Sequence, residues 1–238
     1  MSDIDDSPDE ELALLAPGLI HELRHPLLGI KGGLELVEWK LGSALQGLEE
    51  WTLVRRQVQR MEDFLASYQA LLSPGEAASS FFVVNEVVDQ AVELLAFRVK
   101  RLGKRFDAPR AQPPRVGWGA PNAVLHAVVN VVVNAVDAAE AAGESARVQV
   151  RVVGGPGSDV EVRVSDEGHG VPPELRQRLF EPRFTTKLPG KGTGLGLHIA
   201  RTMMRNYGGS VRLVEEGDPA RLSWARTEFT VEIPARPD

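Results

Sequence analysis

Apolar residues in the first third of the chain recur at steps of three or four positions. One run extends from Leu12 to Leu41 and a second from Val54 to Leu72. This spacing places one apolar stripe along one face of a helix. Gly42 and Gly47 lie between the two runs and predict a turn. The pattern therefore predicts a helical hairpin, which ends where Ser73-Pro74-Gly75 interrupts the second run.

Two long helices with one apolar stripe each must cover those stripes. Pairing with a second copy gives a four-helix bundle, and packing against the rest of the same chain is the alternative. We expect the homodimer. Pro17-Gly18 indicates that the long first helix begins nearer Leu19. The expected organisation is an acidic N-terminal tail over residues 1–11, a dimerisation hairpin over residues 12–74 and a second domain over residues 80–238.

The second domain has a different pattern, in which short alternating runs are interleaved with helical ones. Asn85 can cap a helix that reaches about Leu102, and Pro121 suits the first turn of a helix that reaches about Ala142. A short helix is predicted at 173–179 and another at about 195–207. Strands are predicted at 81–84, around 116, and at 147–153, 160–165, 210–215 and 228–233. Helices interleaved with hairpin-linked strands indicate an α/β sandwich, and with the hairpin an α+β protein.

Composition excludes several classes of function. The 238 residues carry a net charge of -6, which argues against nucleic acid as a partner because an acidic surface repels phosphates. The absence of cysteine excludes disulfides, thiolate zinc sites and a cysteine nucleophile, and it fits a cytoplasmic protein. We read no apolar run that approaches the roughly eighteen residues of a membrane helix, so we expect no membrane segment in this chain.

One helix carries a polar stripe on an otherwise apolar surface. His126, Asn130, Asn134 and Asp137 are spaced by four, four and three residues, with mainly valine and alanine between them. Burying an unpaired amide costs about 1 to 3 kcal/mol, so the stripe must meet water, an ion or a ligand. An asparagine oxygen suits Mg²⁺ held jointly with phosphate. From this helix alone, a solvated face and a ligand site are equally good interpretations.

Two glycine-containing segments follow. Asp166-Glu167-Gly168-His169-Gly170 places an acceptor at a strand end, beside backbone that a flat ring can approach. In Gly190-Lys191-Gly192-Thr193-Gly194-Leu195-Gly196-Leu197, glycines at every second position expose backbone N–H groups just before a helix. Such a segment can hold phosphate, although it matches neither a P-loop nor a dinucleotide fold. A plain turn and a flexible loop are the alternatives for the two segments.

These elements occur in a recognisable order, with Phe180-Glu181-Pro182-Arg183-Phe184-Thr185-Thr186-Lys187 before the last of them. The series resembles the N, G1, F and G2 boxes of the GHKL ATPase superfamily, and its F box is similar to that of nitrogen-regulation histidine kinases. The resemblance runs from about residue 10 to the end. It implies a dimeric helical hairpin, or four-helix bundle, followed by a GHKL (Bergerat-type) α/β sandwich that binds ATP and Mg²⁺.

The resemblance also implies roles for individual residues. Asn134 would be the metal ligand, Asp166 would read adenine, and residues 171–191 would form a mobile lid over ATP. Arg183 stands where the family often has an aromatic residue. The positions so assigned to the nucleotide are His126, Asn130, Asn134, Asp137, Asp166, Gly168, Gly170, Phe180, Thr186, Lys187, Gly192, Thr193, Gly194, Leu195, Gly196 and Leu197.

The last motif, His21-Glu22-Leu23-Arg24-His25-Pro26, permits two interpretations. His-Glu-x-x-His is the signature of zinc hydrolases, but Pro26 would disturb the helix that must hold both histidines. Read as the H box of a histidine kinase, His21 is the phosphate-accepting nucleophile and Glu22 fixes its tautomer. Pro26 would then kink the helix as a hinge, and His25 replaces the family's usual asparagine or threonine.

By the same resemblance, the protein would be a sensor histidine kinase of a two-component system. It would phosphorylate His21 from Mg²⁺-ATP and pass the phosphoryl group to an aspartate of a response-regulator receiver domain. The alternatives are a GHKL module that binds ATP without kinase activity, and a zinc hydrolase.

Overall fold

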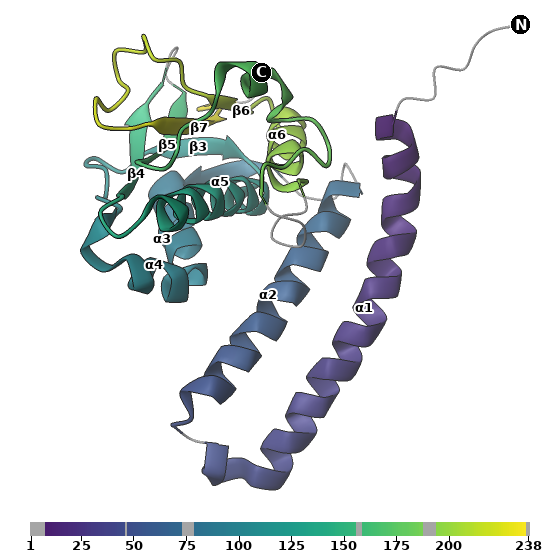
Figure 1. Ribbon diagram of the computed structural model, residues 1–238. Helices are drawn as coiled ribbons and strands as arrows, with labels where there is room; N and C mark the ends of the chain where they lie inside the picture. Colours follow the sequence, from purple (N-terminus) through teal and green to yellow (C-terminus); the bar gives the residue numbers. More distant parts are fainter. Residues whose placement is uncertain (1–7, 46, 73–78, 156–158, 188–193, 237–238) are drawn as a thin grey trace, which may run out of the picture. The chain divides into compact units, whose positions relative to one another are not determined.

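The computed structural model describes residues 8–45, 47–72, 79–155, 159–187 and 194–236 (Figure 1). The chain forms two compact units, Met1–Ala77 and Ala78–Asp238. The first unit is helical and the second combines helices with two sheets. The structure is therefore of the α+β class expected from the hydrophobic pattern.

The first unit is a hairpin of two long helices. α1 spans Pro8–Leu41, the 3₁₀ turn η1 spans Gly42–Leu45, and α2 spans Glu49–Leu72. Gly42 and Gly47 adopt positive φ angles of 38° and 89°, a region that L side chains rarely enter, so the two glycines permit the reversal. Glu49 and Glu50 lie in the first turn of α2, where their charge complements the helix dipole.

The start of α1 corrects one expectation. The helix begins at Pro8 rather than near Leu19, and it runs without a break through Pro17-Gly18 and through Pro26. A proline inside a helix removes one backbone hydrogen bond, and the leucine-rich turns on either side favour the helical state strongly enough to continue across it.

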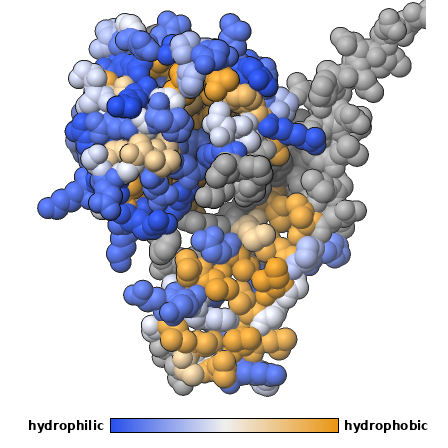
Figure 2. All heavy atoms as spheres, viewed as in Figure 1, coloured by the Kyte–Doolittle hydropathy of each residue, from blue (hydrophilic) through white to orange (hydrophobic). Residues whose placement is uncertain are grey.

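In each helix of the hairpin, buried and exposed apolar residues alternate along the apolar stripe. Leu27, Val58 and Leu65 are buried, with Leu34 packed against them. The members between them remain 38% to 52% exposed: Leu23, Ile30, Val37, Val54 and Met61. Figure 2 shows hydrophobic side chains gathered on the surface of the hairpin. The two sets each repeat at seven-residue intervals up to Leu41, which ends α1 and is 53% exposed. The hairpin therefore has an internal seam and a second, uncovered apolar seam.

The second unit is built around a mixed sheet of five strands in the order β2-β4-β5-β7-β6, with a separate β1-β3 pair. The strands of the large sheet are antiparallel except for the parallel β2-β4 pair. The elements are β1 Ser80–Val83, α3 Val84–Leu94, α4 Ala96–Leu102, η2 Gly103–Arg105, β2 Phe106–Asp107, β3 Val116–Gly119, α5 Pro121–Ala142, β4 Val148–Gly154, β5 Val160–Asp166, η4 Pro173–Arg178, α6 Gly196–Arg205, β6 Ser210–Leu213 and β7 Thr227–Ile233.

The core lies between one face of this sheet and α3, α5 and α6. The valines of β4 and β5 alternate inward, and α5 meets them with a face made only of valine and alanine. Small residues on α5 allow the helix to lie close to the sheet. Among the described residues, α5 is the one helix long and apolar enough to cross a membrane, contrary to our expectation that no such run exists. Half of its apolar window is buried, as in the core helix of a globular domain.

Two further details differ from the predicted pattern. The predicted helix over 85–102 is broken at Leu95 into α3 and α4. Asn85 is not the cap of α3, because the cap position is Val83. Asn85 is buried inside the helix, where its Oδ1 accepts a hydrogen bond from the Arg115 backbone N–H at 3.0 Å. Its Nδ2 donates to the Ala111 carbonyl, so this side chain instead fastens the loop between β2 and β3.

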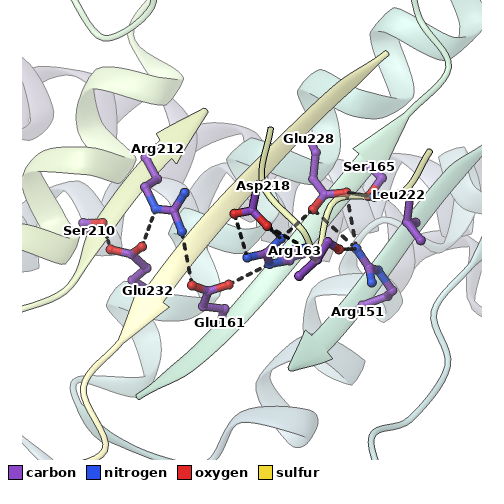
Figure 3. Close-up of polar contacts among 11 residues, drawn as sticks. Arg151, Glu161, Arg163, Ser165, Ser210, Arg212, Asp218, Leu222, Glu228 and Glu232 are labelled. Atoms are coloured by element: carbon purple, nitrogen blue, oxygen red, sulfur yellow. Dashed lines mark hydrogen bonds and ion pairs between the residues drawn. The ribbon is translucent and has the colours of Figure 1, made fainter. Parts of the chain in front are cut away.

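The face of the sheet opposite the helices carries charged residues that are buried (Figure 3). Arg163 of β5 bonds Glu161 at 2.6 Å, Glu228 of β7 at 3.2 Å and Asp218 at 3.1 Å. Glu228 also accepts a hydrogen bond from Ser165. Asp218 belongs to the β6–β7 connection, which also contributes the Leu222 N–H to Glu228. This connection covers the charges, and the network ties it to the central strands.

Candidate nucleotide-binding site

The polar stripe of α5 is half-buried and meets the start of α6. The Asn130 Nδ2 donates to the His126 carbonyl at 3.0 Å, which fixes the orientation of the amide. A Cβ added to Gly196 would lie 2.8 Å from the Asn130 Oδ1. The predicted N and G2 boxes are therefore in contact, and a side chain at position 196 would displace the Asn130 amide from this orientation.

Further along α5, Asn134 and Asp137 direct oxygen atoms at the same cation. The Lys187 ammonium donates to the Asn134 Oδ1 at 3.2 Å and to the Asp137 Oδ2 at 2.5 Å. Arg98 of α4 binds the other carboxylate oxygen of Asp137 and also Glu140. Partial burial alone would raise the pKa of Asp137, but the hydrogen bonds from Lys187 and Arg98 lower it below its usual value. Asp137 is thus held as an anion between two cations.

Asp166 ends β5 with its carboxylate almost fully buried. Its Oδ1 accepts a hydrogen bond from the Gly168 N–H at 2.8 Å, and the Thr227 hydroxyl also bonds the carboxylate. Burial raises the pKa of Asp166 to about 6, although both hydrogen bonds act in the opposite direction. A carboxylate that is buried yet largely ionised at neutral pH is a strong acceptor for a ligand amino group.

Gly168 follows Asp166 in a space that excludes any side chain. A Cβ at this position would lie 2.6 Å from the Ala138 Cβ and 2.7 Å from the Asp166 Oδ1. Gly170 adopts a φ of 79°, so the turn beyond it also requires glycine. The Asp166 turn therefore packs directly against α5, one helical turn beyond Asn134. The N and G1 boxes are brought together as predicted.

The F box is anchored to the core through its first aromatic ring. Phe180 packs edge-on against Phe229 with the ring centroids 6.3 Å apart, and the Arg201 guanidinium lies over the Phe180 ring at 4.5 Å from its centroid. The His198 Nδ1 lies 3.0 Å from the Phe180 carbonyl oxygen. These contacts attach the start of the F box to β7 and α6.

The F and G2 boxes meet through their backbones at Arg183 and Gly194. Arg183 has a φ of 63°, and Gly194 has a φ of 69°. A Cβ on Gly194 would lie 2.4 Å from the Arg183 carbonyl carbon, so the two backbones touch. Thr186 is exposed. Leu195 caps α6, and Leu197 packs against the core. Gly192 and Thr193, which the resemblance assigned to the nucleotide, lie outside the described residues.

The predicted phosphate acceptor lies on the other compact unit. His21 and Glu22 occupy backbone positions within α1, and their side chains lie outside the described residues. His25 lies one helical turn further along α1 and is exposed.

Two side chains of the site were not found from the sequence. Arg98 was read only as part of a helix, and nothing in its local pattern points to Asp137. Thr227 was read as the residue before the last strand. Its register opposite Asp166 in the β5–β7 pair could have suggested the contact only once the strand pairing was known.

The donor groups suit a nucleotide with a bound divalent cation. The Asn134 and Asp137 oxygens are hard ligands of the kind Mg²⁺ prefers, and they already converge on a positively charged group. Gly168 and Gly196 leave spaces that a Cβ would fill. A flat ring beside Asp166 and phosphates beside the start of α6 fit this arrangement.

Comparison with known proteins decides the family. The model of the histidine kinase-, DNA gyrase B-, and HSP90-like ATPase family matches residues 119–237, which contain all of these boxes. The chain belongs to this ATPase family. Its relatives over most of its length are sensor kinases, so the prediction of a histidine-kinase catalytic core is confirmed.

Two curated relatives and one solved structure show how similar this chain is to known proteins. The nitrogen regulation protein NtrY of Azorhizobium caulinodans is 29% identical over 92% of this chain and 29% of its own length. The histidine-protein kinase/phosphatase MprB of Mycobacterium ulcerans is 30% identical over 96% of this chain and 45% of its own. The crystal structure of full-length ShkA, in complex with AMPPNP, superposes with a TM-score of 0.64 at 25% identity, covering 95% of this chain and 46% of ShkA. The chain spans less than half the length of these relatives.

Proposed function

We propose that this chain is the kinase core of a two-component system, which transfers the γ-phosphoryl group of ATP to His21 and then to an aspartate of a response-regulator receiver domain. The observation that carries the proposal is the convergence of Asn134, Asp137, Asp166 and the Gly194–Gly196 backbone around α5 in a family of ATPases. The histidine-containing helix α1 supplies the acceptor.

In the proposed complex, the Asp166 carboxylate accepts a hydrogen bond from the adenine amino group. Gly168 leaves room for the ring, and the N–H groups at the start of α6 bind phosphate oxygens. Asn134 and Asp137 are the residues that would hold Mg²⁺, which offsets negative charge on the phosphates when bound. Binding of AMPPNP, an ATP analogue, by the related ShkA structure supports adenine nucleotide as the ligand.

His21 acts as the nucleophile in this proposal. A neutral imidazole nitrogen forms a bond to the γ-phosphorus while the bond from that phosphorus to the bridging oxygen breaks, and ADP leaves with the electron pair. Glu22 accepts a hydrogen bond from the other ring nitrogen, which fixes the tautomer and stabilises the developing positive charge. The second transfer, to a receiver aspartate, restores the neutral imidazole.

The functional unit is proposed to be a homodimer whose hairpins form a four-helix bundle. The support is the second apolar seam, in which Leu23, Ile30 and Val37 on α1 repeat at seven-residue intervals and are exposed. A second hairpin would cover this seam in the manner of a coiled coil. We place the reaction in the cytoplasm, where ATP is available to the kinase.

A labelling experiment tests the proposal. The protein is incubated with γ-labelled ATP and Mg²⁺, and the bound label is tested for the stability of a phosphoramidate, which is lost in acid and retained in alkali. Wild type and His25→Gln should retain label, whereas His21→Gln and Asn134→Ala should not. Label that persists in His21→Gln would assign the acceptor elsewhere. Nucleotide binding without labelling would favour a non-catalytic ATP-binding module, and zinc in the purified protein would favour the hydrolase.

A further inference from the structure

Lys187 occupies an unusual position for a lid residue. Its ammonium group bonds the Asn134 Oδ1 and the Asp137 Oδ2 at once, at 3.2 and 2.5 Å. Both partners belong to one face of α5, and the lysine and aspartate side chains are only 32% and 25% exposed. The contact joins residue 187, at the end of the F box, to the N box across 50 positions of sequence.

The acceptors of this ammonium group form a preorganised cation site. Arg98 bonds the Asp137 Oδ1 and neighbouring Glu140, so the carboxylate is fixed and its Oδ2 remains directed at the lysine. An amide oxygen and a carboxylate oxygen that meet at one point are ligands for a hard cation as well as for an ammonium group. The ammonium group therefore stands where a divalent metal ion would bind.

We propose that the Asn134–Asp137 pair is a cation site with two alternating occupants, the Lys187 ammonium group in the free protein and Mg²⁺ in the nucleotide complex. Asp137 is then a second metal ligand beside Asn134, and Arg98 is the positioning residue that holds it. Because both cations use the same oxygens, Lys187 must leave before the metal ion binds. This inference rests on the proposed nucleotide site.

The exchange links metal binding to the lid. When Lys187 leaves Asp137, its charge becomes available to the phosphates, and the end of the F box is released from α5. The free protein is thereby latched with its lid lysine against the N box. The cost of breaking the latch reduces the affinity for metal-bound nucleotide by an amount set by one partly exposed ion pair, up to about fivefold.

Calorimetric titration with ADP is carried out in excess Mg²⁺ and separately in EDTA. The coupling is measured as the ratio of the ADP affinity in Mg²⁺ to the ADP affinity in EDTA. ADP is the suitable probe because it lacks the γ-phosphate that would attract Lys187 most strongly. Lys187→Ala should raise the ratio by up to about fivefold, and Asp137→Asn should lower it. The matched control, Lys104→Ala, removes an exposed lysine of the same unit and should leave the ratio unchanged.

The double variant separates the latch from simple loss of charge. If Lys187 acts through Asp137, Lys187→Ala should produce no increase in the ratio on the Asp137→Asn background. An equal increase on both backgrounds, or none on either, overturns the proposal. Hydrogen exchange of the nucleotide-free protein gives a second readout. Amides of residues 183–187 should exchange faster in Lys187→Ala than in wild type, and equal rates would also overturn it. Wild type that binds no ADP under either condition would instead refute the nucleotide site itself.

Discussion

Replacing Asp166 with asparagine should separate the stability of the ATPase domain from its ability to bind nucleotide. The carboxylate is 2% exposed, and its pKa is raised from 3.8 to about 6 by burial. Asparagine has almost the same shape and can still accept the hydrogen bond from the Gly168 N–H. It removes the titrating charge while the packing around Ala138 is kept.

The pKa difference fixes the sign and size of the stability effect. Between about pH 4 and pH 6 the folded protein binds more protons at Asp166 than the unfolded chain does, so the contribution of this group to stability is lost as the pH rises. A shift of about two pKa units corresponds to about 3 kcal/mol of unfolding free energy. Asparagine does not titrate, so in Asp166→Asn this residue causes no fall in unfolding free energy as the pH rises. Its stability relative to wild type should therefore rise by up to about 3 kcal/mol from pH 4 to pH 7.

Nucleotide binding should respond in the opposite direction. The neutral amide of the Asp166→Asn variant cannot offer a charged acceptor to the adenine amino group, and a hydrogen bond to a charged group contributes about 1.5 to 3 kcal/mol. The affinity for ADP should fall by about tenfold or more. In wild type the affinity should also decline as the pH falls below about 6, because the carboxylate becomes protonated.

Urea unfolding from pH 4 to pH 7, with ADP titration of the same samples, measures both effects. Glu167→Gln is the control: the hydrogen bond from Arg147 lowers the pKa of this neighbouring carboxylate, so the stability of the variant relative to wild type should not rise with pH, and its ADP affinity should be unchanged. A difference in stability between Asp166→Asn and wild type that is independent of pH would refute the buried, raised-pKa carboxylate. Unchanged ADP affinity in Asp166→Asn would refute its role in reading adenine.

Three further substitutions test other parts of the structure. Gly168→Ala forces a methyl group against the Ala138 Cβ, so it should destabilise the domain by about 1 to 3 kcal/mol in urea unfolding and reduce ADP binding. Arg163→Met removes the cation that bridges the buried Glu161 and Glu228. The unfolding free energy should fall by about 3 to 5 kcal/mol, and a loss below about 1 kcal/mol would contradict the network. Ile30→Asp places a charge in the uncovered seam. Light scattering should then show a monomer instead of a dimer, while the helical circular dichroism is retained. An unchanged mass would exclude that seam as the interface.

Much of the fold follows from hydrophobic periodicity. The valine and alanine face of α5 and the alternating valines of β4 and β5 predicted the central helix and its sheet, and both are present. The resemblance to the GHKL boxes implied that the N, G1 and G2 segments bind one nucleotide and therefore meet. Gly168 and Gly196 do approach α5, and the approach of Gly168 to Ala138 leaves no space for a Cβ.

Other features depend on contacts that no local pattern encodes. Glu161 and Arg163 alternate with the valines of β5 as if they faced water, but the β6–β7 connection buries them. Asparagine is a common helix-capping residue, but the side-chain amide of Asn85 instead forms hydrogen bonds with two backbone groups of a distant loop. Lys187 was placed near phosphate by resemblance, and its bond to Asp137 emerges only from the folded chain.

Locating the transferred phosphate tests the account most directly. The protein is phosphorylated with Mg²⁺-ATP, digested at neutral pH and sequenced by tandem mass spectrometry under conditions that preserve phosphohistidine. We predict one modified residue, His21, at a level that disappears in Asn134→Ala. A phosphate on any other residue, or none on a protein that binds ATP, would contradict the claim that the nucleotide site on α5 serves the histidine of α1.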